Sequence, residues 1–560
     1  MKIRPAFRTR HQTRSVFATE AQRHRATHAW EFGHAFTKIP LCLCASVANT
    51  VWNPSRLEGS WLRLLRPAVL AGLIAMVAPL HAAEDLAKLT LTEAAAQIRA
   101  GKVTSVQLTE ACLARIETFD PKLDAFITVM KTQALAQAAA LDAEAKAGKF
   151  RGPLHGVPVA LKDNVDTAGV RTTGGSALFA DRVPAEDATV TARLMAAGAV
   201  IIGKTNLQEF AMGGGETSFY GPARNPWNLA HNTGGSSSGS GAAVAAFLAY
   251  GAIGTDTGGS IRMPASYCGI VGFKATYGLV PIRGVIPLRV SMDHAGPMTR
   301  TVEDSALMLN VLAGYDNLDI TSVDHPREDY VAEMKQPVKA FKVGLPYGYF
   351  DHLDPEVKAA VDTAVALLAK LTSGAGEMSL PIATRPPAGG AETLAWHAEY
   401  FKASPNLYML PERRRLDTLA KDNGGTAVDY VKGMWENQLL RRTVDDAFTK
   451  AGVDLVVMPT QRILPPLLDD LIKKAYDTKP ADPSLTSNTS AFNVFGLPAI
   501  SIPCGFSKSG LPIGLMIAGP HFSEGKILAL ARAYEQATDW HKRQPPLSIE
   551  TPKPQVLAGG

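Results

Sequence analysis

The sequence has few cysteines, and their spacing does not indicate a structural role. Only five occur in 560 residues, Cys42, Cys44, Cys112, Cys268 and Cys504, and they form neither a metal-binding pattern nor a disulfide framework. From residue 84 onward there is also no pair of histidines at metal-binding H-x-x-x-H spacing. We therefore predict no metal and no other cofactor, and we interpret the last three cysteines as small buried apolar side chains.

A large excess of one charge is also missing from most of the chain. The net charge is +5, but residues 1–66 hold eleven Lys/Arg and only three Glu, so the remainder carries −3. Recognition of nucleic acid depends on clustered positive charge, which this remainder lacks. We therefore expect no nucleic acid as a direct partner.

No apolar run is long enough for a comfortable membrane span, which needs roughly 20 residues. The apolar stretch 68–80 follows Arg63 and Arg66 and precedes Ala82 and Ala83. A basic flank, a short apolar run and a small-residue end are typical of a secretory signal peptide, with an uncleaved anchor as the alternative.

We expect residues 1–83 to form a leader, with the signal peptide at about 60–83. Residues 1–50 show no hydrophobic periodicity, so we expect translation to begin nearer Val51 or Leu57. Cleavage near Ala82 or Ala83 would make the protein periplasmic or secreted, without a stable membrane span; the alternative location is the cytoplasm.

From residue 84 to 548 the chain has the pattern of a globular α/β protein, because short apolar runs and glycine-rich turns alternate with helical patterns. A capping box at Thr104–Gln107 and an alanine-rich segment at 132–147 predict helices. Residues 330–450 are richer in charge and are interpreted as a helical insertion, and 549–560 as a tail. The expected strands lie at 157–161, 200–202, 242–248, 453–458, 499–503 and 512–517, and the expected helices of the insertion at 356–371 and 428–450.

The segment Gly198–Thr205 matches the phosphate-binding pattern G-x-x-x-x-G-K-[ST]. A phosphate-binding loop needs its middle residues as an open turn that leads into a helix at the lysine. Here the middle residues include Val200, Ile201 and Ile202, which favour a buried strand. We therefore do not predict nucleotide binding.

Two clusters of glycine and serine are the strongest functional signal. Gly234–Gly239 contains Ser236, and Gly258-Gly259-Ser260 follows 24 residues later, with core-like apolar residues between them. Glycines at the edges of buried elements let backbone N–H groups approach a ligand closely. Lys162 ends an apolar run upstream, where burial would lower its pKa and produce a neutral amine that can act as a base.

His294 follows Asp293 and could be taken for the base of a Ser–His–Asp triad. A lone histidine beside an aspartate is more often a satisfied structural group. We therefore favour the lysine over the histidine as the base.

With these motifs the sequence resembles the amidase signature family. The segments that carry the likeness include Gly234–Ala245, Gly254–Ala265, Gly156–Asn164, Cys268–Lys274 and Phe492–Pro503, and together they extend over roughly residues 88–545. The resemblance implies one large α/β/α layered domain around a mixed, twisted β-sheet. It covers residues 330–450 only weakly.

The resemblance also implies a Ser–cis-Ser–Lys triad, with Ser260 as nucleophile, Ser236 as bridging serine and Lys162 as base, and a cis peptide bond before Ser236. The backbone N–H groups of Thr257, Gly258, Gly259 and Ser260 would form the oxyanion hole. Asp163, Asp256 and Arg262 would support these groups. Ser238 and Met516 stand where many members have glycine and glutamine, and neither belongs to the triad.

The implied activity is hydrolysis of a linear carboxylic amide through a Ser260 acyl-enzyme. One alternative is the A-type subunit of an aminoacyl-tRNA amidotransferase, which shares these motifs; another is a binding relative without catalysis. The expected partners are a small-molecule amide and, as an open option, a second copy of the chain.

Overall fold

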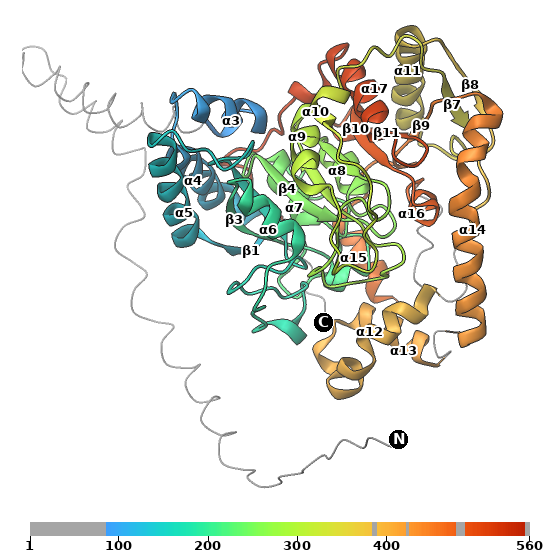
Figure 1. Ribbon diagram of the computed structural model, residues 1–560. Coiled ribbons are helices and arrows are strands. Elements are labelled where there is room, and N and C mark those ends of the chain that lie inside the picture. The colour runs from blue at the N-terminus through green and yellow to red at the C-terminus, as the bar shows by residue number, and fades with distance from the viewer. Residues whose placement is uncertain (1–85, 384–388, 422–424, 478–487, 555–560) are drawn as a thin grey trace, which may run out of the picture. The chain divides into compact units, whose positions relative to one another are not determined.

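The computed structural model describes residues 86–383, 389–421, 425–477 and 488–554, which belong to one compact unit (Figure 1). The predicted leader and signal peptide lie outside these residues. No helix within the described ranges is long and apolar enough to cross a bilayer.

The centre of the unit is an eleven-stranded mixed sheet, in the order β1-β3-β2-β4-β6-β5-β10-β11-β9-β7-β8. The pairs β2–β3, β2–β4, β7–β8 and β7–β9 are parallel, and the other pairs are antiparallel. The strands are β1 (Phe126–Val129), β2 (Pro158–Lys162), β3 (Val200–Thr205), β4 (Gly251–Thr255), β5 (Val271–Lys274), β6 (Ala295–Thr299), β7 (Val343–Pro346), β8 (Ala375–Met378), β9 (Leu455–Pro459), β10 (Ala499–Phe506) and β11 (Pro512–Ala518).

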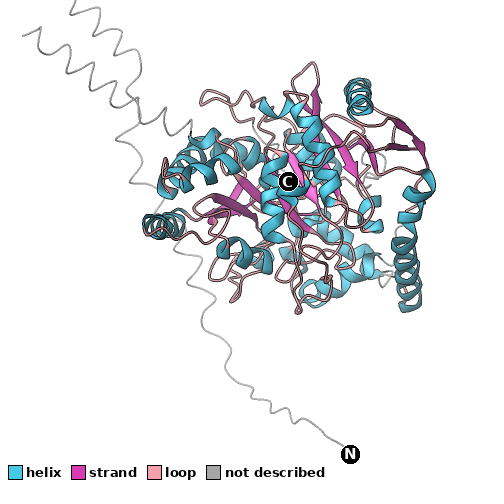
Figure 2. Cartoon of the chain, turned by 45° about the horizontal axis from the view of Figure 1, so that its top comes forward, coloured by secondary structure: helices cyan, strands magenta, loops and turns pink. Residues whose placement is uncertain are grey.

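Helices cover both faces of this sheet (Figure 2). Every residue of β2, β3, β4, β6, β9 and β11 is buried, and successive side chains of a strand point to opposite faces, so both faces must be covered. The helices are α3 (Leu91–Arg99), α4 (Ser105–Leu123), α5 (Lys131–Lys146), α6 (Thr189–Ala196), α7 (Ser238–Ala245), α8 (Arg262–Cys268), α9 (Val302–Leu312), α10 (Tyr330–Glu333), α11 (Pro355–Leu371), α12 (Gly389–Ala403), α13 (Leu410–Lys421), α14 (Ala427–Ala451), α15 (Leu468–Tyr476), α16 (Ala491–Phe495) and α17 (Glu524–Gln536), with short 3-10 turns at η1 (Ala177–Phe179), η2 (Glu209–Ala211), η3 (Pro405–Leu407) and η5 (Trp540–Lys542).

The α/β class and most expected elements are confirmed. The capping box at Thr104 begins α4, and the strands expected at 453–458, 499–503 and 512–517 correspond to β9, β10 and β11. The strand expected at 242–248 is wrong, because most of this segment lies in α7. Alanine has the highest helix propensity, which outweighs the apolar character that suggested a strand.

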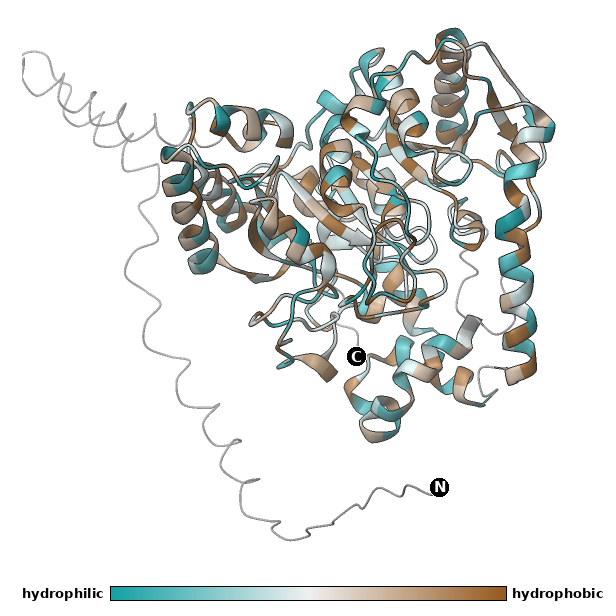
Figure 3. Ribbon diagram, viewed as in Figure 1, coloured by the Kyte–Doolittle hydropathy of each residue, from teal (hydrophilic) through white to brown (hydrophobic). Residues whose placement is uncertain are grey.

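The segment 330–450 differs from the prediction in one respect. After α10 it contains β7 and β8, which flank α11 in the chain and extend the main sheet beyond β9, whereas the helices expected at 356–371 and 428–450 are confirmed as α11 and α14. We call the three helices α12, α13 and α14 the insertion from here on. Its long helix α14 alternates hydrophilic and hydrophobic residues along its length (Figure 3).

Candidate active site

Lys162 is the last residue of β2, and its side chain is fully buried. Its Nζ lies 2.8 Å from Ser236 Oγ and 2.7 Å from Thr255 Oγ1. Burial lowers the pKa of Lys162 to about 7, and the negative charges of Asp256 and Asp293 oppose this shift only partly. A neutral amine at this position can take a proton from the Ser236 hydroxyl.

Ser236 lies in the turn before α7 and is also fully buried. The peptide bond between Gly235 and Ser236 is cis, as the resemblance implies. Only glycine fits before it, because a Cβ on Gly235 would lie 2.3 Å from the backbone nitrogen of Gly215. The loop around Gly215 therefore packs directly against this peptide.

Ser260 lies between β4 and α8, next to Ser236 in space. Its carbonyl oxygen accepts a hydrogen bond of 3.3 Å from the backbone N–H of Ser237. The Ser237 hydroxyl also bonds the backbone of Thr255, so the two glycine–serine clusters are joined directly. Ser260 is half-buried, and its hydroxyl has no hydrogen-bond partner among the described residues.

The backbone N–H groups of the loop Thr257–Ser260 are arranged in a way that the sequence did not predict. The N–H of Gly259 donates to Asp256 Oδ1 at 2.7 Å, whereas the N–H groups of Thr257, Gly258 and Ser260 have no acceptor in the described part of the chain. Three of the four expected oxyanion donors are therefore open, and Gly259 is engaged within the protein.

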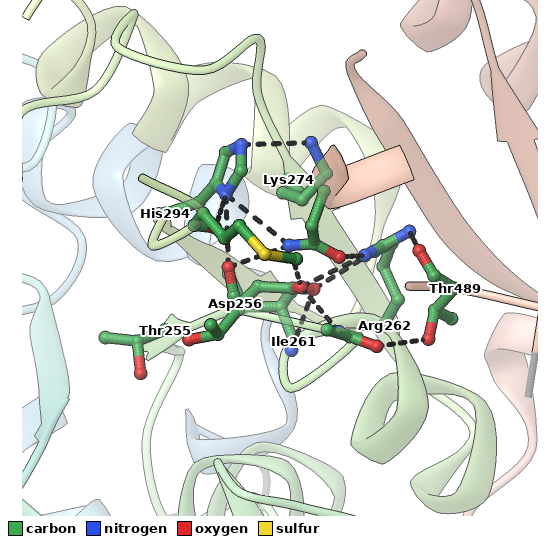
Figure 4. A network of polar contacts seen from close by, with 12 residues as sticks. Thr255, Asp256, Ile261, Arg262, Lys274, His294 and Thr489 are labelled. Atoms are coloured by element: carbon green, nitrogen blue, oxygen red, sulfur yellow. Dashed lines mark hydrogen bonds and ion pairs between the residues drawn. The ribbon is translucent and has the colours of Figure 1, made fainter. Parts of the chain in front are cut away.

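Asp256 and Arg262 hold this loop from inside the protein (Figure 4). Both side chains are fully buried, and two guanidinium nitrogens each lie 3.0 Å from a different carboxylate oxygen. Burial alone would raise the pKa of Asp256, but the charge and hydrogen bonds of Arg262 hold it well below its usual range. This aspartate is therefore a permanent anion that organises backbone N–H groups.

Two residues that sequence reasoning did not single out complete this network. Asn493 donates to Asp256 Oδ1 at 2.8 Å and accepts from Arg262 at 2.7 Å. The Thr489 hydroxyl donates to the Gly258 carbonyl at 2.7 Å. A Cβ on Gly259, whose φ is +129°, would lie only 2.0 Å from Thr489 Oγ1, so this threonine also requires glycine there.

His294 takes part in this network without approaching the serines. Its Nδ1 lies 2.7 Å from the Met292 carbonyl oxygen, and its Nε2 lies 3.3 Å from Lys274 Nζ (Figure 4). Burial, followed by the charge of Lys274, lowers the pKa of His294 well below its usual value. The backbones of His294 and Asp256 also bond each other. The histidine is therefore a neutral structural group beside β4 and β6.

Asp163 follows Lys162 in the sequence, but its side chain contacts Lys204 and Thr173. Its Oδ1 lies 3.5 Å from Lys204 Nζ, and its Oδ2 accepts from the backbone and hydroxyl of Thr173. Lys204 closes the phosphate-loop-like motif and lies in the buried strand β3, as predicted. Within the described ranges no group of three or more His, Cys, Asp or Glu could hold a metal ion.

Comparisons with known proteins show the family of the chain. A family model described as Amidase matches residues 107–528. The chain is 42% identical over 492 residues to the A-type subunit of the glutamyl-tRNA(Gln) amidotransferase of Geobacter sp. (strain M21), covering 83% of this chain and 100% of the relative.

Solved structures give the same family. The peptide amidase of Stenotrophomonas maltophilia is 32% identical, with a TM-score of 0.69, over 83% of this chain and 99% of that one. The A-type subunit of the glutamyl-tRNA(Gln) amidotransferase of Thermotoga maritima is 31% identical, with a TM-score of 0.67, over 84% of this chain and 99% of that one.

Proposed function

The chain belongs to the amidase family, and on that premise we propose that it cleaves a carboxamide through an acyl-enzyme on Ser260. The observation that carries the proposal is the buried amine of Lys162, 2.8 Å from Ser236 Oγ. A buried lysine whose pKa is lowered to about 7 is partly neutral near physiological pH. It can therefore serve as a base where no histidine is in reach.

The reaction begins with two proton transfers. The Ser236 hydroxyl gives its proton to Lys162 Nζ and receives the proton of the Ser260 hydroxyl. Ser260 Oγ then forms a bond to the carbonyl carbon of the substrate, and the carbonyl oxygen becomes an oxyanion. The open N–H groups of Thr257, Gly258 and Ser260 are the proposed donors to that oxyanion, each contributing about 3 kcal/mol.

Collapse of the tetrahedral species breaks the C–N bond. The leaving nitrogen takes a proton from the Ser236 hydroxyl, and the proton held on Lys162 Nζ replaces it. The acyl group stays on Ser260. A water molecule, activated through the same two residues, then forms the new C–O bond and releases the carboxylate. Asp256 stays paired with Arg262, and Asp163 stays paired with Lys204. These residues act by holding the loops.

The experiment is to trap the acyl-enzyme. The purified chain is mixed with a panel of primary and substituted amides in the presence of hydroxylamine, which competes with water for an acyl-enzyme. We expect a hydroxamate product and an acyl adduct on the Ser260 peptide by mass spectrometry. Amide cleavage without either product, or an adduct on another residue, would disprove the assignment.

The fate of the released nitrogen separates two finer functions. The curated relatives favour the A-type role in an amidotransferase, because the chain covers 100% of such a relative at 42% identity. In that role the ammonia would pass to a second reaction in an assembly. The predicted leader favours a stand-alone hydrolase, but it lies outside the described residues. We therefore give this comparison more weight than the leader.

Stand-alone hydrolysis is the second candidate, and the likeness to a solved peptide amidase supports it. Cleavage of an amide by the purified single chain, without ATP or tRNA, at rates that added tRNA and ATP leave unchanged would favour it. Cleavage that appears only with partner subunits would favour the amidotransferase role. N-terminal sequencing of the protein from cells tests the expected export: a mature terminus near residue 84 would support it.

A further inference from the structure

A contact between the core and the insertion is made by two carboxyl groups. Glu209 lies in η2 of the core, and Glu412 lies in the first turn of α13. Both are buried, with 0% and 2% of their surfaces exposed. Their contacts cross: Glu209 accepts from the backbone N–H of Met409, three residues before Glu412, and Glu412 accepts from Gln208, the residue before Glu209.

The hydrogen-bond partners of the pair are all neutral. Glu209 accepts from the Ser176 hydroxyl and, at 2.8 Å, from the backbone N–H of Met409. Glu412 Oε1 accepts from Gln208 Nε2 at 2.6 Å and from Thr217 Oγ1 at 2.8 Å.

Glu412 Oε2 is buried and has no hydrogen-bond partner among the described residues unless Glu209 provides one. Two carboxylates without a proton both lack a donor, so a hydrogen bond between them requires that one is protonated. A direct hydrogen bond within the pair therefore needs at least one proton.

The same residues reach the catalytic serine through one loop. The backbone N–H of Gln208 donates to the Ser236 carbonyl at 3.2 Å. Gln208 Oε1 accepts from the backbone N–H groups of Gly215 and Thr217, at 2.9 and 3.0 Å. Gly215 is the residue that packs on the cis peptide before Ser236. A continuous chain of contacts thus joins α13 to the bridging serine.

We propose that Gln208, Glu209 and Glu412 are positioning residues that join the docking of the insertion to the placement of Ser236, and that one proton shared by the two carboxyl groups keeps this contact closed. The effect on activity rests on the proposed function, whereas the docking itself does not. When both groups ionise, the adjacent negative charges repel each other, and the contact between Glu412 and the loop 208–217 weakens.

The neighbouring groups set the pH at which this occurs. Burial raises the pKa of Glu209 to about 8 and that of Glu412 to about 7. Glu216, whose own pKa is raised by burial, acts to raise the pKa of Glu412, while Arg415 acts to lower the pKa of Glu216 and donates to the Met212 carbonyl. Burial also raises the pKa values of the facing Tyr408 and Tyr476, so neither adds negative charge at these pH values.

Because the folded pKa values lie above the ordinary value of a glutamate, the carboxyl pair stabilises docking fully only below that ordinary value, and this contribution weakens as the pH rises and is lost once the pH passes about 8. The amine of Lys162 also titrates near pH 7, but it must lose its proton for catalysis. It therefore limits the rate on the acid side, while the carboxyl pair limits it on the alkaline side.

Amide hydrogen exchange of residues 410–421 and steady-state amide cleavage, both on the full chain between pH 6 and 9.5, test the proposal. In the wild type we expect exchange, corrected for its intrinsic pH dependence, to rise about tenfold as the pH increases from 6 to about 8 and to level off above about pH 8. We expect kcat to fall by a similar factor, since small displacements of a reacting group are costly.

Glu412→Gln is the decisive variant. Its carboxamide can donate to Glu209 at every pH while its oxygen still accepts from Gln208 and Thr217. We expect both alkaline changes to disappear, and the acid-side dependence of the rate to stay. Glu209→Gln is the second variant: it also removes the like charges, so the alkaline changes should disappear, but its NH2 replaces one of the oxygens that accept from Ser176 and Met409, so we expect it to be less stable than Glu412→Gln. Asp417→Asn, an exposed position of the same helix, is the control and should behave as the wild type.

Each outcome decides one part of the proposal. If Glu412→Gln and Glu209→Gln both keep the alkaline rise in exchange, the shared proton is wrong. If exchange responds to pH but kcat does not, the connection to Ser236 is wrong. If no variant or wild-type protein cleaves any amide, the proposed function fails, while the exchange measurement still decides whether the carboxyl pair controls docking.

Discussion

Two buried pairs of ionisable groups contact the loops of the two serines to which we assign the chemistry, and they have opposite electrostatic designs. Asp256 and Arg262 carry opposite charges, and the aspartate also receives N–H groups from Gly259 and Ile261. The Glu209–Glu412 pair has like charges and needs a proton to remain in contact.

The difference shows how one site can combine a fixed part with a part that responds to conditions. A buried ion pair of opposite charge with full hydrogen bonding keeps its geometry over a wide pH range. A buried pair of carboxyl groups keeps its geometry only while one of them is protonated. The first pair orders the loop that holds Ser260, and the second joins the insertion to the loop beside Ser236.

Ser260→Ala gives the largest expected effect. It removes the chemical step and leaves both ionisable pairs intact. We expect kcat for amide cleavage to fall on the order of 10⁶-fold, because the acyl-enzyme cannot form. The hydroxyl has no hydrogen-bond partner among the described residues, so the thermal unfolding midpoint should stay unchanged. Steady-state kinetics and a melting curve check both points. A rate within tenfold of the wild type would place the nucleophile elsewhere.

Lys162→Met is expected to lower kcat by about 10²- to 10⁴-fold, the usual contribution of a general base. In the wild type the rate should rise as the pH increases through about 7, because the amine must be neutral. The variant should lack this rise.

The same group has a measurable effect on stability. Its folded pKa lies below that of an unfolded lysine, so the unfolded chain binds more protons between about pH 7 and 10. The contribution of Lys162 to the free energy of unfolding therefore increases with pH in this range. Urea unfolding at several pH values should show this slope in the wild type and a smaller one in Lys162→Met. Equal slopes would mean that the amine is not buried as described.

The parts of the site that the sequence predicts are those with local signals. Glycines beside serines, and a lysine at the end of an apolar run, identify Ser236, Ser260 and Lys162 because each signal lies within a few residues. Thr489 and Asn493 have no such signal, since their contacts to the nucleophile loop join residues more than 200 positions apart. Glu209 and Glu412 are likewise brought together only by the fold.

The same distinction applies to the secondary structure. The apolar strands at 453–458 and 512–517 are predicted correctly because burial on both faces requires continuous apolar residues. The strand β8 is missed, since three of its four residues are only half-buried or exposed and the segment shows no clear pattern. At 242–248 burial is complete in a helix as well, so apolar character could not distinguish the two states.

Arg262→Met breaks the opposite-charge pair by leaving Asp256 buried without its cation. We expect the free energy of unfolding to fall by about 3–5 kcal/mol, measured by urea denaturation. The double variant Asp256→Asn/Arg262→Met should lose less than the sum of the two single variants, because it leaves no unpaired charge. Glu412→Gln should cost much less, since its carboxamide satisfies every partner. A loss in Glu412→Gln as large as in Arg262→Met would contradict the electrostatic difference between the pairs.

Thr489→Val gives the smallest expected effect and tests why the nucleophile loop is rigid. The peptide between Gly258 and Gly259 is held at its oxygen by Thr489 and at its N–H by Asp256. Valine keeps the shape that fills the space beside Gly259 but removes the hydroxyl, so one of the two ends is released. We expect a loss of about 1 kcal/mol in unfolding free energy, because the other end stays bonded to a permanent anion. A loss as large as that of Arg262→Met would mean that the hydroxyl, and not the ion pair, fixes the loop.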